Sequence, residues 1–152
     1  MIYHTSPAAI SKPQKFGRFG EFIFFSSGVY TMTEVANPVV YGIDEDQLKI
    51  VEAKAMPYID NFHIICADVI NDVAEMFDVD FDTAHDILTE KESEWDYDCD
   101  AEKSLDRQKL TAKAAKLMGF DGVQVEDEQG AAYMISIVDH FDKMRVLDES
   151  EI

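Results

Sequence analysis

The sequence has only two cysteines and no long apolar run, and each shortage excludes a class of protein. Cys66 and Cys99 form no CxxC pair and are too few for a disulfide scaffold, which favours a reducing compartment. No stretch approaches the roughly 18 consecutive apolar residues of a transmembrane helix, and the N-terminus lacks a basic region followed by an apolar one. We therefore expect a soluble protein of the cytoplasm.

Positive charge is also scarce. The chain has 13 Lys and Arg against 31 Asp and Glu, a formal net charge of −18. Such a surface repels nucleic acid and anionic membranes and favours basic protein partners. Two interpretations remain open: a solvated surface that resists association, or an acidic mimic that occupies the nucleic-acid groove of another protein.

The common motifs of nucleotide and metal sites are absent as well. The sequence has no GxxxxGK and no GxGxxG, and its four histidines show no HxxxH or HExxH spacing. "DYDCD" and "DVDFD" have the spacing of the first EF-hand ligands, but neither has the glycine at position six or the acid at position twelve. We expect no metal. Cys66 lies on an apolar helical stripe and Cys99 among acids, so neither is expected to be a reactive thiolate.

What is present is an order of strands, then helices, then strands, which is typical of an α+β fold. We expect one domain over residues 1–148 and an acidic tail over 149–152. The predicted elements are three early strands, a helix of about five turns, two further helices, a hairpin and a last strand. They cover residues 1–6, 22–25, 39–43, 59–77, 82–91, 102–118, 122–138 and 144–149, in that order. Gly119 is the expected C-cap of the third helix.

Two strands carry polar residues that are unusual for their positions. In "IYHTS", alternation places His4 on the face of Ile2. A histidine there is either a hydrogen-bonded core residue or part of a site, and the aromatic strand that follows could supply a flat wall for a ring.

The second strand ends in three consecutive acids. In "GVQVEDE", alternation places Asp127 on the side of Val123 and Val125, and it places Glu126 and Glu128 on the solvated side or at the rim of a cleft. A carboxylate on the inner side of a strand end costs free energy unless it is paired or functional. Asp127 is therefore a candidate functional residue.

Three segments together resemble the ADP-ribosyltransferases. "YHTSP", "RFGEFIFFSS" and "QVEDEQG" occur in the order of the diphtheria-toxin and poly(ADP-ribose) polymerase branch, which has His, Tyr and Glu on successive strands. The ends are more closely similar to the small phage anti-CRISPR ADP-ribosyltransferase that acts on type I-F systems, above all through "MGFDGVQVEDEQG". The resemblance covers the two ends of the chain and not its middle. It implies a small split antiparallel sheet of ADP-ribosyltransferase type with a central helical insertion.

The resemblance also implies roles for individual residues, with NAD as co-substrate and no metal. His4 would hydrogen-bond the ribose, and Thr5 would hold the nicotinamide carboxamide through its backbone. Phe24 and Phe25 would wall the nicotinamide pocket. Arg18 would reach the pyrophosphate, and Asp127 would be the catalytic acid.

Three departures from the family pattern leave alternatives open. Phe24 stands where the branch usually has tyrosine, and Thr5 replaces a glycine, which narrows the pocket. The inward acid is aspartate rather than glutamate, so Glu126 or Glu128 could be the catalytic acid if a bulge shifts the register. These departures favour transfer of single units over polymer synthesis.

The expected function is mono-ADP-ribosylation of a protein target, such as a basic, nucleic-acid-binding subunit of a CRISPR effector. The alternatives are a catalytically inactive acidic DNA mimic that binds a nucleic-acid-binding protein, and an NAD glycohydrolase with water as acceptor. Direct binding of nucleic acid or membrane is not expected.

Overall fold

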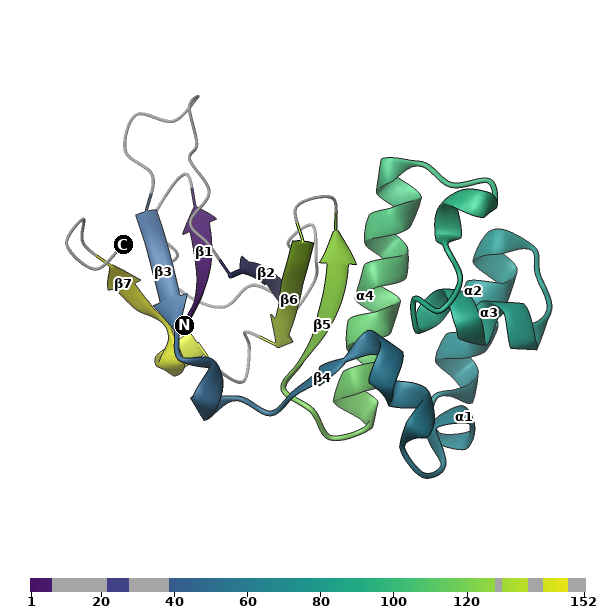
Figure 1. Cartoon of the computed structure of the whole chain (residues 1–152), viewed down its shortest axis with the longest axis horizontal. Helices are drawn as coiled ribbons and strands as arrows, with labels where there is room; N and C mark the ends of the chain where they lie inside the picture. Colours follow the sequence, from purple (N-terminus) through teal and green to yellow (C-terminus); the bar gives the residue numbers. More distant parts are fainter. Residues whose placement is uncertain (7–21, 28–38, 128–129, 137–140, 148–152) are drawn as a thin grey trace.

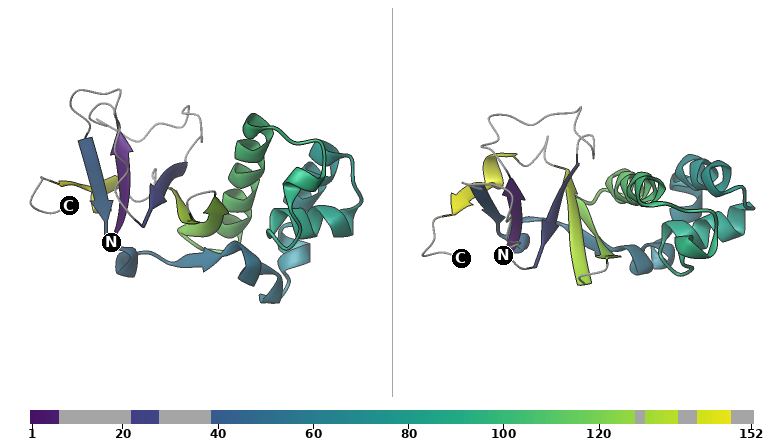
Figure 2. Two further views of the ribbon diagram at one scale, coloured as in Figure 1. Left: turned by 45° about the horizontal axis from the view of Figure 1, so that its top comes forward. Right: turned by 90° about the horizontal axis from the view of Figure 1, so that it is seen from above.

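The computed structural model describes residues 1–6, 22–27, 39–127, 130–136 and 141–147. They form an elongated α+β structure with strands at one end and helices at the other (Figures 1 and 2). The α+β prediction is confirmed. Arg18, Glu128 and the tail 149–152 lie outside the described residues, so the predictions for them stay predictions.

One seven-stranded sheet runs through the structure in the order β4-β5-β6-β2-β1-β3-β7. Its strands are β1 (Ile2–Ser6), β2 (Phe22–Ser26), β3 (Val39–Ile43), β4 (Ile50–Glu52), β5 (Gly122–Asp127), β6 (Gly130–Ser136) and β7 (Arg145–Leu147). All neighbours are antiparallel except β4 and β5, which are parallel. The expected split antiparallel sheet is therefore corrected to a continuous mixed one.

The parallel strand β4 was not predicted, because three residues are too few to show alternation. A parallel pair needs a long crossover between its strands, and here all the α-helices form it. The α-helices are α1 (Phe62–Ile65), α2 (Ala67–Phe77), α3 (Phe81–Leu88) and α4 (Ala101–Leu117), and the 3₁₀ helices include η1 (Glu45–Gln47), η2 (Ala53–Tyr58), η3 (Glu94–Asp96) and η4 (Phe141–Lys143). The crossover is thus the central helical insertion that was expected.

The predicted helix over 59–77 is two helices, because the chain leaves helical geometry at Cys66 between α1 and α2. The other two helices are confirmed, and the acidic clusters explain where they start. Asp80 accepts a hydrogen bond from the backbone N–H of Thr83, and Asp100 accepts one from that of Lys103, both at 2.8 Å. The segments that resemble EF-hand loops are therefore helix N-caps.

Two clusters of buried side chains lie on opposite faces of the sheet. The larger one joins α1 to α4 with β4, β5 and β6 and includes Val123 and Val125, both fully buried. The smaller one, near β1, β2 and β3, contains Ile2 and Phe25. In Figures 1 and 2, α4 stands beside β5 and separates the sheet from α2 and α3. The helices thus cover only one end of the sheet.

Candidate functional site

His4 lies on β1, as predicted, and its ring is fixed by the neighbouring strand. Its Nδ1 lies 2.8 Å from the carbonyl oxygen of Phe24. A carbonyl can only accept, so Nδ1 carries the proton and donates it. Burial lowers the pKa of His4 below 6.5, and the hydrogen bond to Phe24 offsets only part of this. His4 is therefore neutral at pH 7, with a lone pair on Nε2 that can accept a hydrogen bond from a hydroxyl group.

The two predicted aromatic wall residues take different faces of the sheet. Phe25 is fully buried in the smaller cluster, and its ring lies 5.7 Å from that of His4. Phe24 is half-buried and packs against the larger cluster. Phe25 therefore lies on the His4 face but has no exposed surface for a ligand. Which of the two contacts a ligand stays a prediction, as does the role of Thr5, which pairs with Val40 of β3.

The strand register places five residues in one row across five strands. His4 pairs with Tyr41 on one side, and one step on from the Tyr3–Ser26 pair it faces Phe25 on the other. The row continues through Tyr133 of β6 to Gln124 of β5. The His4 face of the sheet thus leads directly to the strand that carries the predicted acids.

Of the three candidate acids, Glu126 is the one whose side chain the structure describes. It stands two residues beyond Gln124, so alternation gives it the His4 face, whereas Val123 and Val125 face the helices. Its side chain is 70% exposed, as predicted, and lies 3.5 Å from Lys54 Nζ. Asp127 ends β5 opposite Gly130, and its catalytic role stays a prediction.

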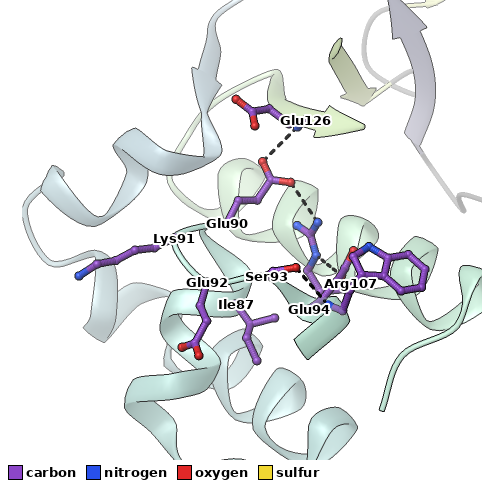
Figure 3. A pocket seen from close by; sticks show the side chains of 9 residues that line it. Ile87, Glu90, Lys91, Glu92, Ser93, Glu94, Arg107 and Glu126 are labelled. Carbon is purple, nitrogen blue, oxygen red and sulfur yellow. Dashed lines mark hydrogen bonds and ion pairs between the residues drawn. The ribbon is translucent and has the colours of Figure 1, made fainter. Parts of the chain in front are cut away.

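The end of β5 is held by a buried charged network that reaches it from the helices. The backbone N–H of Glu126 donates to Glu90 at 3.1 Å, beyond the point where β4 ends. Glu90 in turn accepts from Arg107 of α4 at 3.0 Å, and Figure 3 shows it between the two. Arg107 also donates to Glu94 at 2.8 Å and to Thr111 at 2.9 Å. The three side-chain nitrogens of this arginine therefore each have a partner.

The charged groups of this network lose contact with water, and their pairing with one another offsets that cost. Arg107 is 3% exposed and Glu94 is 7% exposed. Burial raises the pKa of Glu90, and the Arg107 guanidinium opposes that rise. Two carboxylates share one cation, so the cluster carries a net negative charge beside the strand end when both are ionised. It positions the backbone that bears the acids.

Several hollows open around this strand end, and Glu90 or Glu126 lines each of them. One of about 340 Å³ lies over the network (Figure 3). A second, of about 460 Å³, runs along the first turns of α4. A third, also of about 460 Å³, lies beside Tyr58 and His85. Solvent therefore reaches the end of β5 from the helical side as well as from the His4 face.

Sequence reasoning missed Glu90, Arg107 and Gln108. Arg107 stands at position twelve of the "DYDCD" segment, where an EF-hand would have an acid. The signal for Arg107 was the lack of an apolar stripe in α4, which indicates that polar side chains form its buried face. The buried residues of this helix indeed include Ser104, Arg107, Gln108 and Thr111. Which acids approach it depends on how α3 and α4 pack, and that is not encoded locally.

Neither cysteine suits nucleophilic catalysis. Cys66 is fully buried, as predicted, and burial raises its pKa to about 11. Burial, with Glu94 as the next cause, also raises the pKa of Cys99. Among the described residues, no three or more His, Cys, Asp or Glu side chains form a group that could hold a metal ion.

The fold is shared with a protein of known structure. The chain is similar to the crystal structure of an anti-CRISPR protein, with a TM-score of 0.57 and 21% sequence identity over 88% of this chain and 87% of that one. At this identity the likeness shows the fold alone. No family model matches the chain, and no curated protein matches it. Within the described ranges, no helix is long and apolar enough to cross a membrane.

Proposed function

We propose that this protein is an anti-CRISPR protein that transfers single ADP-ribose units from NAD to a protein of the CRISPR machinery. The anti-CRISPR part is supported by the fold shared with an anti-CRISPR protein over most of both chains. The transferase part is supported by the three segments that resemble ADP-ribosyltransferases, which contribute to β1, β2 and β5. CRISPR effectors hold nucleic acid on basic surfaces, so the charge of −18 would steer the encounter.

The observation that carries the transferase proposal is the arrangement of His4 and the acids. A neutral histidine on β1 offers the lone pair of Nε2, and the same sheet face leads along one row to Gln124 of β5, with Glu126 two residues further on that face. A ribose hydroxyl that donates to His4 would place the sugar on this face. Transfer requires a carboxylate at the anomeric carbon of that sugar, and in this row three strand spacings of roughly 4.8 Å separate β1 from β5.

The chemistry requires a sugar held in place and a carboxylate near its anomeric carbon. Breaking the bond between nicotinamide and ribose creates an oxocarbenium-like centre, which a nearby carboxylate stabilises by charge, as in glycosidases. A side chain of the target then attacks the anomeric carbon, and nicotinamide leaves with the bonding electrons. The residues of the site hold the sugar and the charge in place, which supplies much of the rate enhancement.

The test is to incubate the protein with NAD and a type I-F CRISPR surveillance complex, and to measure intact masses and free nicotinamide. Glu126→Gln and Asp127→Asn identify the catalytic acid, and Glu75→Gln on the exposed face of α2 is the matched control. We expect one added ADP-ribose on one subunit, lost in one of the two acid variants only. An unmodified complex without released nicotinamide would contradict the proposal.

A second candidate is favoured by charge alone. With 31 acids against 13 basic residues, the protein could block a nucleic-acid groove as an acidic mimic without any catalysis. The mimic predicts that inhibition needs no NAD and survives both acid substitutions. Nicotinamide released in the absence of the complex would instead indicate a glycohydrolase.

A further inference from the structure

One of the hollows beside β5 has features that neither the fold nor the proposed chemistry uses. It has a volume of about 460 Å³ and follows one face of the first two turns of α4. We call it the Trp95 pocket, and its lining includes Trp95, Ala101, Leu105, Gln108 and Glu126. It is open to solvent and combines apolar walls with a few polar groups, as ligand sites do.

Gln108 is the first unusual feature of the Trp95 pocket. It is 7% exposed, and its Oε1 is buried without a hydrogen-bond partner; in the described part of the chain it is the one buried side-chain oxygen or nitrogen in this state. A buried carbonyl oxygen without a donor destabilises the folded chain. Gln108 lines the pocket, and its χ3 torsion has broad minima, so a rotation of the amide is the change that would offer this oxygen to a donor there. The position therefore suits a ligand that brings N–H groups.

Trp95 is the second feature. It is the only tryptophan of the chain, and it is 57% exposed although large aromatic side chains are usually covered. Trp95 lines the pocket together with residues of α4. An exposed indole face attracts planar cations through its π-electrons, and more strongly than other aromatic rings do.

Charge selects between possible ligands. Glu126, whose exposed carboxylate lies 3.5 Å from Lys54 Nζ, is among the residues that line the Trp95 pocket, and the lining includes no Lys or Arg. Glu94, at the inner end, is occupied by Arg107 and Ser104. The positive end of the α4 dipole lies here too, but Asp100 caps it. The pocket therefore disfavours phosphates and favours a cation.

We propose that the Trp95 pocket receives an arginine side chain of the protein partner as a docking anchor. A guanidinium is planar, stacks on an indole, has five N–H donors and no acceptor, and stays charged at any working pH. It would donate to Gln108 Oε1 and to Glu126, where it would compete with the exposed pair that Glu126 makes with Lys54. The anchor concerns the binding of the partner and does not depend on the turnover of NAD, so either proposal can fail without the other.

The single tryptophan makes binding directly measurable. We would titrate the protein, without NAD, with the peptide acetyl-Gly-Arg-Gly-amide and follow Trp95 fluorescence, beside the lysine and citrulline counterparts at constant ionic strength. We expect a saturable change with the arginine peptide, with half-saturation at a concentration about five-fold lower than for lysine. Citrulline keeps the shape without the charge and should give no saturable change. Equal responses to arginine and citrulline would overturn the proposal.

Substitution of Gln108 separates a ligand-binding role from a structural one. Gln108→Leu keeps the approximate volume and removes the unpaired oxygen. We expect about five-fold weaker binding of the arginine peptide together with a Tm about 3 °C higher. A structural glutamine would show a lower Tm on the same substitution. Gln47→Leu, at an exposed position outside the pocket, is the matched control and should change neither value. A lower Tm with unchanged peptide binding would contradict the proposal.

Discussion

The two ends of the molecule bury their polar groups in opposite ways. At the helical end, Arg107 is fully charged and is held by Glu90 and Glu94. At the strand end, burial keeps His4 neutral, although its hydrogen bond to the Phe24 carbonyl opposes this. A buried charged network is rigid but fails when one partner is removed, whereas a neutral histidine takes up a proton once the pH falls below its lowered pKa. The comparison suggests that the helical end fixes the backbone of β5 and that the strand end responds to ligand and pH.

The largest effect is expected at the helical end. Arg107→Ala leaves two buried carboxylates without their cation, and we expect the free energy of unfolding to fall by about 3–5 kcal/mol. Urea denaturation at pH 7 measures this. The matched control is Lys109→Ala on the same helix, whose partly exposed pair with Asp106 spans 3.8 Å and should contribute less than about 1 kcal/mol. Equal losses for the two variants would remove the distinction between the network and a surface ion pair.

A smaller loss is expected where a strand approaches its neighbour most closely. A Cβ at Gly122 would lie 2.5 Å from Ile135 Cδ1 and 2.7 Å from the backbone oxygen of Met134. Gly122→Ala should therefore destabilise the protein by about 1–3 kcal/mol, because the backbone of β6 has to move. Urea denaturation checks this too. Unchanged stability would show that β5 and β6 can separate at Gly122 without cost, contrary to this close contact.

The link between the two ends can be tested through Glu90. Glu90→Gln keeps an acceptor for the N–H of Glu126 but weakens the bonds to that group and to Arg107. If Glu90 positions the catalytic strand, kcat for ADP-ribose transfer should fall about ten-fold while KM for NAD is unchanged. Glu92→Gln, whose partner is Tyr97, is the control and should leave kcat as it is. A raised KM with normal kcat would mean that Glu90 acts on NAD binding instead.

The smallest effect concerns the pH response of the strand end. The pKa of His4 lies below 6.5 in the folded protein and near 6.5 in the unfolded chain. Between these two pKa values the imidazole of the unfolded chain binds a proton and that of the folded protein does not. Stability should therefore fall as the pH drops below about 6.5, with no contribution from His4 above that pH. Tm measured from pH 7.5 to 5.5 should decline less steeply in His4→Phe than in the wild type. Parallel profiles would contradict the neutral assignment.

The sequence predicted those features that depend on local pattern. Apolar periodicity located α2, cap signals located α3 and α4, and the hairpin of β5 and β6 followed from alternation on both sides of its turn. Exposure of Glu126 and burial of Cys66 followed from the same patterns. Periods of two and 3.6 residues are properties of the chain itself and need no knowledge of packing.

The rest depends on distant pairings. β4 is a strand because β5, about 70 residues later, offers it a parallel neighbour, with Val51 opposite Val123 and Glu52 opposite Gln124. The three residues of β4 are too few to show an alternating pattern of their own. The network joins residues of α4 to the loop after α3, and its buried polar face gave α4 no apolar stripe. The opposite faces of Phe24 and Phe25 do follow from alternation, but the resemblance to a family suggested a shared wall instead.

The most direct test of NAD binding at the strand end is hydrogen exchange with and without saturating NAD, resolved by peptide. The prediction is slower exchange in β1, β2 and the end of β5, with α2 and α3 unchanged, because the ligand would hold the strands that carry His4 and the acids. Unchanged exchange throughout the sheet at saturating NAD, or protection confined to α2 and α3, would contradict it.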